Sequence, residues 1–185
     1  MAEEKTVSSR SIFQGRAFNV RIDTVINAAG EETTREIVEH AECIVAIPVD
    51  ASGDILLVRQ YRKAVEKELL ELPAGGIDPG EDPDTAVKRE LQEEIGFRPG
   101  WIKRIGGFYS SPGFCTEYLY LYLAGDLQPG QLYAEDTPGI QTVRIQPRQI
   151  RRLISSGEIC DSKSIAGLLY FLEFRRNLLP GTSPG

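Results

Sequence analysis

Residues 75–97 combine strong local folding signals with a dense set of charges. They read G-G-I-D-P-G-E-D-P-D-T-A-V-K-R-E-L-Q-E-E-I-G-F. Asp82 is a good helix N-cap residue, Pro83 suits the first helical position, and Gly96 stands where a helix often ends in the left-handed conformation. The sequence therefore predicts a glycine-rich loop followed by a helix over residues 83–95.

The predicted helix carries an apolar stripe beside an acidic one. At about 100° per residue, side chains three and four positions apart share a face. Three carboxylates at this spacing repel one another unless a cation or basic side chains lie between them. A solvated acidic face is the alternative to a binding face. The apolar stripe is Val87, Leu91 and Ile95, and the acidic stripe is Glu90, Glu93 and Glu94.

A divalent metal would relieve this repulsion. Sites built only from oxygen ligands suit Mg²⁺ or Mn²⁺, whereas zinc favours Cys or His. The single histidine, His40, lies outside the stretch. Arg89 stands four residues before Glu93, which is close enough for the two to pair on a helix. This pairing would hold the acidic face in place and leave Glu90 and Glu94 to face the metal.

The stretch matches a known pattern at every fixed position. The pattern is G-x5-E-x7-R-E-U-x-E-E-x-G-U, where U is bulky and apolar, and a match of this length rarely arises by chance. The chain therefore resembles a Nudix hydrolase. The resemblance implies an α/β/α sandwich with a mixed sheet over residues 42–178. The matching residues are Gly75, Glu81, Arg89, Glu90, Leu91, Glu93, Glu94, Gly96 and Phe97.

Composition limits the class of protein and of partner. With 185 residues, 41% hydrophobic and 26% charged, the chain suits one globular domain with a small appendage. The net charge of -6 argues against a broad nucleic-acid surface, so we expect a small-molecule partner. The longest mostly apolar stretch, residues 165–174, is too short to span a membrane, and the N-terminus does not read as a signal peptide. We therefore expect a cytoplasmic protein whose three scattered cysteines are reduced.

Residues 1–41 predict a β-rich N-terminal arm, with strands at 11–13, 17–26 and 33–39. An arm with no core of its own must pack on its own domain or on a partner chain. In Nudix proteins that resemble ADP-ribose pyrophosphatases, such an arm crosses the boundary of a homodimer. The resemblance thus implies a homodimer formed through the arm.

The remaining chain alternates strands and helices, and residues 179–185 are expected to be a disordered tail. Residues 119, 121 and 123 are leucines and residues 118, 120 and 122 tyrosines, so these two sets should face opposite sides of one strand. The last helix is apolar enough to be buried on more than one side. Further strands are expected at 43–49, 55–61, 69–73, 101–108, 117–124 and 141–145, and further helices at 147–156 and 162–177.

Three segments outside the pattern resemble ADP-ribose pyrophosphatases. They are the runs Arg59-Gln-Tyr-Arg and Leu70-Glu-Leu-Pro-Ala-Gly, and the run Ser-Pro-Gly at 111–113, whose proline stands fifteen residues after Phe97. An ordinary turn is the alternative explanation for Ser-Pro-Gly. The resemblance implies that the substrate is bound by Arg59, Arg62, Glu71, Ser111, Pro112 and Gly113, with Arg62 the first candidate for a phosphate clamp and Arg59 the second.

The resemblance also implies a reaction, the Mg²⁺-dependent hydrolysis of ADP-ribose to AMP and ribose 5-phosphate. Glu90, Glu94 and the backbone carbonyl of Ala74 would hold the metal, with Arg89 supporting them. Glu135 would be the general base, and Asp136 and Glu93 are the alternatives. Two rival functions stay open. One is the hydrolysis of another nucleoside diphosphate sugar such as GDP-mannose, and the other is the binding of ADP-ribose by a non-catalytic sensor.

Overall fold

The computed structural model describes residues 3–134 and 139–178, the last four of these by their backbone only. The predicted base Glu135, its alternative Asp136 and the predicted tail lie outside the described residues. The chain divides into two compact units, and the boundary falls after Glu42. The first unit also contains Tyr109–Tyr118, and the second contains Cys43–Phe108 and the chain from Leu119 onward. No helix in the described ranges is long and apolar enough to cross a membrane.

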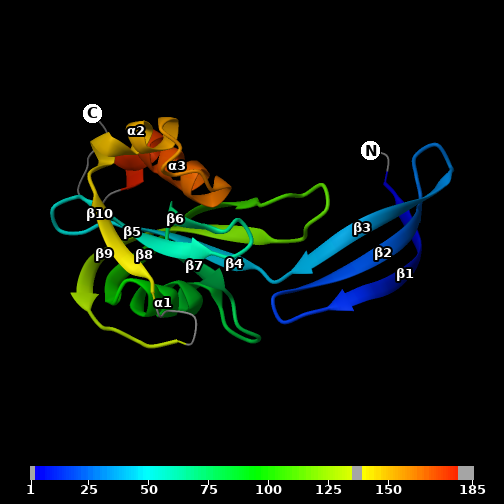
Figure 1. Ribbon diagram of the computed structural model, residues 1–185, viewed down its shortest axis with the longest axis horizontal. Coiled ribbons are helices and arrows are strands. Elements are labelled where there is room, and N and C mark those ends of the chain that lie inside the picture. The colour runs from blue at the N-terminus through cyan, green and yellow to red at the C-terminus, as the bar shows by residue number, and fades with distance from the viewer. Residues whose placement is uncertain (1–2, 135–138, 179–185) are drawn as a thin grey trace. The chain divides into compact units, whose positions relative to one another are not determined.

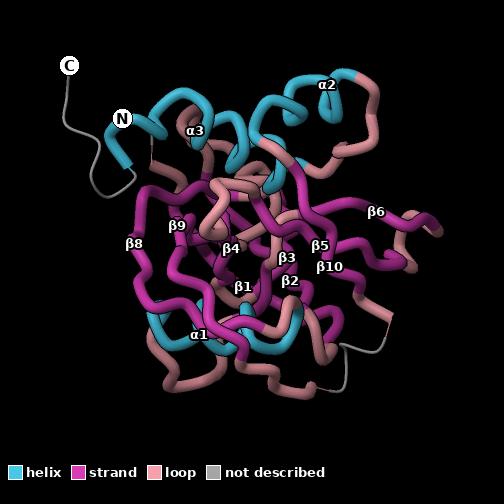
Figure 2. The backbone as a smooth tube through the Cα atoms, turned by 90° about the vertical axis from the view of Figure 1, so that its left-hand side faces the viewer, coloured by secondary structure: helices cyan, strands magenta, loops and turns pink. Residues whose placement is uncertain are grey.

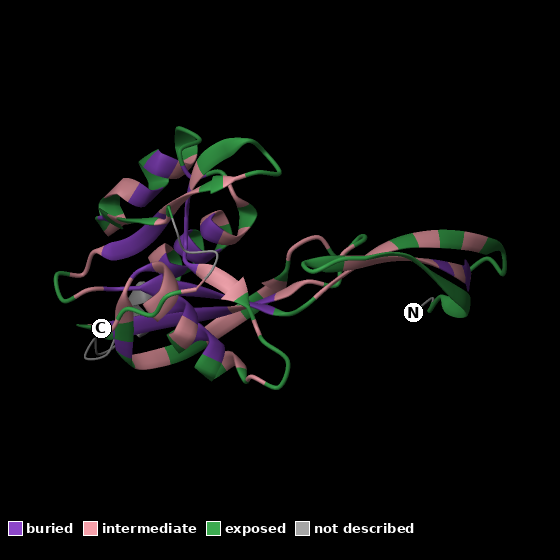
Figure 3. Cartoon of the chain, turned by 60° about the horizontal axis from the view of Figure 1, so that its bottom comes forward, coloured by how far each residue is buried: buried purple, intermediate pink, exposed green. Residues whose placement is uncertain are grey.

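The first unit is an antiparallel sheet of three strands in the order β1-β2-β3, so the arm is β-rich as predicted, with a first strand longer than the predicted residues 11–13. Its strands are β1 (Lys5–Gln14), β2 (Phe18–Ile26) and β3 (Glu32–His40). The segment Tyr109–Tyr118 joins β3, since the Val38 N–H donates to the carbonyl of Phe114 at 2.8 Å. Among the described residues of this unit only Asp23 and Val25 are buried (Figure 3). The sheet therefore has almost no core of its own.

The second unit contains two sheets. One has four strands in the order β7-β4-β9-β8, and the other has three in the order β10-β5-β6. Strand β4 runs parallel to β9 and antiparallel to β7, so the larger sheet is mixed, as predicted. The strands are β4 (Cys43–Pro48), β5 (Ile55–Arg62), β6 (Lys67–Glu71), β7 (Ala74–Gly76), β8 (Phe97–Tyr109), β9 (Tyr118–Pro129) and β10 (Gln141–Ile145).

Helices cover both sides of these strands, and the predicted α/β/α sandwich is confirmed (Figures 1 and 2). On one side α1 (Pro83–Glu94) packs its Val87 and Leu91 against Ile44 of β4. On the other side a short 3₁₀ turn, η1 (Pro147–Gln149), leads into α2 (Ile150–Ser155) and then α3 (Ser162–Leu178). Alternate residues of each central strand thus enter two separate apolar cores.

Strand β9 shows this alternation directly. Leu119, Leu121 and Leu123 lie in the core beneath α2 and α3, whereas Tyr122 lies in the core beneath α1. The predicted separation of leucines from tyrosines is confirmed. The three leucines and Tyr122 are buried because each face of the sheet carries a helical layer, whereas Tyr120 is only partly buried against the core beneath α1.

Helix α3 differs from its prediction. It buries Leu168 and Phe171 but leaves Leu169, Tyr170 and Phe174 between 37% and 44% exposed. The prediction that it is buried on more than one side is therefore wrong. The helix forms the outermost layer, and the Tyr170 hydroxyl donates to the Ile105 carbonyl at 2.9 Å while its ring packs on Phe174.

Candidate active site

Helix α1 begins and ends where the sequence predicted. The Asp82 carboxylate accepts hydrogen bonds from the backbone N–H groups of Asp84 and Thr85 at 3.0 and 3.1 Å, so it caps the first turn. The helix is capped at Ile95, and Gly96 follows with φ +76°, a conformation that favours glycine. Between these ends, α1 is bonded to β7 through Glu94, which accepts from Ala74, and Arg89, which donates to Gly76.

Glu90 lies directly against the backbone of Gly75. Strand β7 pairs with β4, which places Gly75 over the carboxylate of Glu90, itself only 9% exposed. A Cβ at Gly75 would stand 2.1 Å from the Glu90 carboxyl carbon. Glycine is therefore required here by close approach: any side chain would occupy the position of this carboxylate.

Glu94 lies one turn further along the same face. Its Oε2 accepts a hydrogen bond from the Ala74 N–H at 3.0 Å. Burial, reinforced by the neighbouring charge of Glu90, raises the pKa of Glu94 to about 8. Burial also raises the pKa of Glu90, against the influence of Arg89. Two poorly solvated carboxylates side by side make this a place where a cation would be stabilised.

Arg89 ties the acidic face to the preceding loop. Its guanidinium donates two hydrogen bonds to Glu81, from Nε to Oε1 at 3.0 Å and from Nη2 to Oε2 at 2.9 Å. Its Nη1 donates to Glu90 at 2.7 Å and to Glu93 at 3.1 Å, so the predicted Arg89–Glu93 pair is present. Nη2 also donates to the Gly76 carbonyl at 2.9 Å. These contacts, led by those with Glu81, raise the pKa of Arg89 and fix the helix, β7 and the loop together.

A cavity of about 460 Å³ opens over this face. It brings together the three predicted metal-binding residues with Arg89, Glu93 and Arg62. Arg59 does not line it and instead pairs with Glu158 at 3.2 Å. Of the two arginines proposed for the phosphate clamp, Arg62 is therefore the better placed. The lining residues are Gln60, Arg62, Ala74, Gly75, Gly76, Asp78, Arg89, Glu90, Glu93, Glu94, Ala134 and Ile140.

Glu71 is absent from this lining. It is only 3% exposed, and its Oε2 accepts from Gln60 at 3.2 Å and from Arg62 Nε at 2.8 Å. Its Oε1 lies 3.0 Å from Lys163 Nζ. Glu71 was predicted to bind the substrate, but in the structure it holds Arg62. Lys163 belongs to no recognisable sequence motif, and its helix is distant from Glu71 along the chain. Only the fold could therefore show this contact.

The segment Ser-Pro-Gly at 111–113 belongs to the first unit. The Ser111 carbonyl accepts hydrogen bonds from the N–H groups of Phe114 and Cys115 at 3.1 and 2.9 Å. This is the turn that Pro112 and Gly113 favour. Substrate binding by these three residues stays a prediction.

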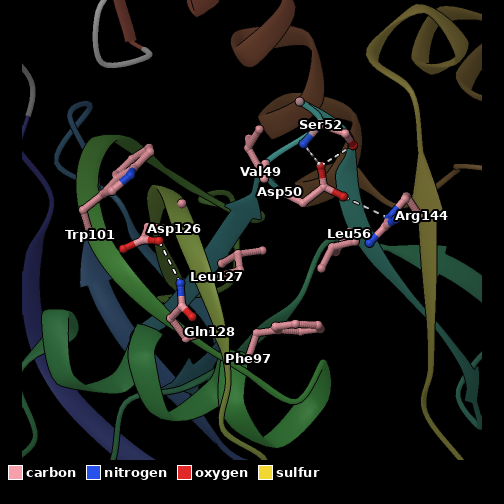
Figure 4. Close-up of a pocket in the computed structure, with 13 residues that line it drawn as sticks. Val49, Asp50, Ser52, Leu56, Phe97, Trp101, Asp126, Leu127, Gln128 and Arg144 are labelled. Carbon is pink, nitrogen blue, oxygen red and sulfur yellow. Dashed lines mark hydrogen bonds and ion pairs between the residues drawn. The ribbon is translucent and has the colours of Figure 1, made fainter.

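A larger cavity, of about 660 Å³, lies elsewhere in the second unit (Figure 4). Its walls include Trp101, Phe97 and Leu127, and its rim carries an ion pair in which Arg144 Nε lies 2.9 Å from Asp50. Asp126, on the opposite wall, accepts a hydrogen bond from Gln128 at 2.9 Å. These two aspartates come from different walls and do not form a cluster of carboxylates. The chemistry therefore points to the smaller cavity over α1.

Comparisons with known proteins agree with this geometry. The NUDIX domain matches residues 39–165. An ADP-ribose pyrophosphatase of Bacillus subtilis (strain 168) is 31% identical over 91% of this chain and 92% of its own length. A methanol dehydrogenase activator of Bacillus methanolicus is 33% identical over the same shares. The crystal structure of an ADP compounds hydrolase shares the fold with a TM-score of 0.87 at 21% identity, covering 98% of this chain and 97% of that one. The chain belongs to the NUDIX domain family.

Proposed function

We propose that this protein hydrolyses the pyrophosphate bond of ADP-ribose and releases AMP and ribose 5-phosphate. The observation that carries the proposal is the meeting of Glu90, Glu94 and the Ala74 backbone with Arg62 in one cavity. Carboxylates and a guanidinium that line one cavity suit a metal-bound diphosphate. The B. subtilis relative, named as an ADP-ribose pyrophosphatase, supports ADP-ribose as the substrate.

We propose that Glu90, Glu94 and the Ala74 carbonyl oxygen bind Mg²⁺, with Mn²⁺ as the alternative. All three donors are oxygens, and no Cys or His lies among the described residues that line this cavity, which suits a hard cation. Gly75 leaves the space above Glu90 free of any side chain. When bound, the metal would neutralise diphosphate charge and lower the pKa of the attacking water.

The chain's own residues would orient the substrate and move the proton. Arg62 would clamp the phosphates, and Arg89 would keep Glu90 in place through the bond of 2.7 Å. We retain Glu135 as the proposed general base, with Asp136 and Glu93 as alternatives. Glu93 already accepts from Arg89 at 3.1 Å, which disfavours it as a base.

The choice of base is tested by Glu135→Gln. If Glu135 is the base, its removal should lower turnover well beyond threefold. Turnover within about threefold of wild type, an effect under ~1 kcal/mol, would move the role to Asp136 or Glu93. Glu93→Gln and Asp136→Asn, assayed in parallel, would then identify the base.

The substrate is tested by turnover with Mg²⁺ across ADP-ribose, GDP-mannose, UDP-glucose, NADH and a nucleoside triphosphate. A clear preference for ADP-ribose supports the proposal. A preference for another compound would keep the chemistry and change the substrate. Tight binding of ADP-ribose without turnover would identify a sensor instead.

We also propose that the protein is a homodimer formed through the three-stranded sheet. The support lies in that sheet's exposed apolar side chains, since Val7, Ile12, Phe13 and Phe18 are between 42% and 56% exposed. Light scattering at micromolar concentration should give twice the monomer mass, and a monomeric mass would refute the proposal. A cytoplasmic location is proposed as well, supported by three free cysteines, and cell fractionation tests it.

A further inference from the structure

A buried group of charges in the second unit is joined to the cavity by Arg62, which lines it. Glu71 on β6 is 3% exposed and stands between two cations. Its Oε2 lies 2.7 Å from Arg62 Nη2, and its Oε1 lies 3.0 Å from Lys163 Nζ. A carboxylate this deeply buried is stable only when its charge is paired and its oxygens accept hydrogen bonds. Both conditions are met, one from each side.

Lys163 occupies an unusual place. It stands in the first turn of α3, where the helix dipole disfavours a positive charge. Its ammonium lies between Glu71 and Asp161, 2.9 Å from the Asp161 carboxylate, and is only 15% exposed. Asp161 in turn accepts from the Ser164 N–H at 3.0 Å, so it caps the helix. The position of Lys163 is therefore explained by the carboxylates that it joins and not by the helix that carries it.

The pairing of Glu71 with Lys163 affects the cavity because Glu71 also binds Arg62. Because Lys163 occupies Oε1, Glu71 offers Oε2 to Arg62, which donates a hydrogen bond to it from Nε and forms an ion pair with it through Nη2. Among the described residues, Nη1 of Arg62 makes no hydrogen bond or ion pair, whereas Nε and Nη2 are both held by Glu71. Held on one edge in this way, the guanidinium keeps Nη1 for a ligand in the cavity that Arg62 lines.

We propose that Lys163 is a positioning residue, which acts through Glu71 to hold Arg62 in the orientation that binds the substrate's diphosphate. Lys163 itself does not line the cavity. The inference rests on the proposed function, because it assigns Arg62 to the phosphates of ADP-ribose. It adds a residue of α3 to the determinants of the reaction.

A double-mutant cycle separates this role from a general contribution to stability. Lys163→Met removes the charge and keeps the length of the stem, while Lys163→Arg restores a donor. Both are measured for kcat and KM with ADP-ribose and Mg²⁺, in the wild-type background and with Arg62→Ala. Lys103→Met is the matched control, because Lys103 is exposed on β8 and forms no hydrogen bond or ion pair with Glu71, Arg62 or Asp161 among the described residues.

Lys163→Met should lower kcat/KM by about 10-fold in the wild-type background but by less than about 2-fold with Arg62→Ala, because the two residues act in one chain of contacts. Lys163→Arg should recover most of the loss, and Lys103→Met should match wild type. Equal losses in both backgrounds, or no loss from Lys163→Met, would overturn the inference.

Thermal unfolding of every variant is measured as the control for changes in stability. If Lys163→Met does not fold, Lys163→Leu, which likewise lacks both the charge and the donor, replaces it in the same cycle with the same criteria. Absence of ADP-ribose turnover in the wild type would refute the proposed function. Turnover in the wild type with an additive cycle would refute the role of Lys163 alone.

Discussion

Gly75→Ala should separate activity from folding. The added Cβ would lie 2.1 Å from both the carboxyl carbon and Oε1 of Glu90, whereas such contacts are essentially never under 3.0 Å. The Glu90 carboxylate must therefore move by at least about 0.9 Å, the difference between these distances. It ends a flexible side chain, so it can swing aside without moving the backbone. Loss of stability should consequently be small.

The activity should respond far more strongly than the fold. A displacement of about 1 Å at a reacting centre can cost on the order of 100-fold in rate, so we expect a loss of that size in kcat/KM for ADP-ribose. Gly76→Ala is the matched control, because a Cβ there meets no atom within 4 Å. The assay is AMP release with Mg²⁺, together with thermal unfolding of both variants. Activity of Gly75→Ala within about threefold of Gly76→Ala would refute the argument that this glycine makes room for Glu90.

Three further predictions concern the core, the pH dependence of stability and the metal. Leu91→Ala should lower the free energy of unfolding by about 2–5 kcal/mol, because Leu91 is 0% exposed on the inner face of α1. The 40% exposed Leu169 is its control, and urea unfolding of Leu169→Ala should show a change of about 0.5 kcal/mol or less. Hydrogen bonds from Arg89 lower the pKa of Glu81 below its ordinary 4.5. The ionised Glu81 carboxylate therefore stabilises the fold fully above pH 4.5, and this stabilisation is lost as the pH falls through the lowered pKa. The difference in the free energy of unfolding between wild type and Glu81→Gln, measured by urea unfolding, should therefore become smaller as the pH is lowered. A difference that stays constant with pH would contradict this. Chelation by EDTA should abolish turnover and Mg²⁺ should restore it, with unchanged circular dichroism because neither apolar core contains the carboxylates of the site.

The parts of the structure that depend on local sequence could be predicted. The ends of α1 follow from Asp82 and Gly96, whose side chain and backbone conformation act within one turn. The two faces of β9 follow from alternation of leucine and tyrosine. The approach of Arg89 to Glu93 follows from helical spacing.

The parts that depend on tertiary packing could not be predicted in the same way. Strand β7 has three residues and is a strand only because β4 pairs with it. Glu71 reads as a substrate ligand in sequence, yet the fold buries it between Arg62 and Lys163. The exposed face of α3 is as apolar as a buried one, and only the absence of a further layer over it among the described residues distinguishes the two.

The central claim is that the acidic face of α1 binds a divalent metal and hydrolyses ADP-ribose. The most direct test follows AMP release from ADP-ribose as Mg²⁺ is titrated into wild type and Glu94→Gln. The account predicts saturable, Mg²⁺-dependent release by wild type and a rate lowered at least about 100-fold in Glu94→Gln at the same metal concentration. Release that is independent of Mg²⁺, or equal in the two proteins, would contradict it.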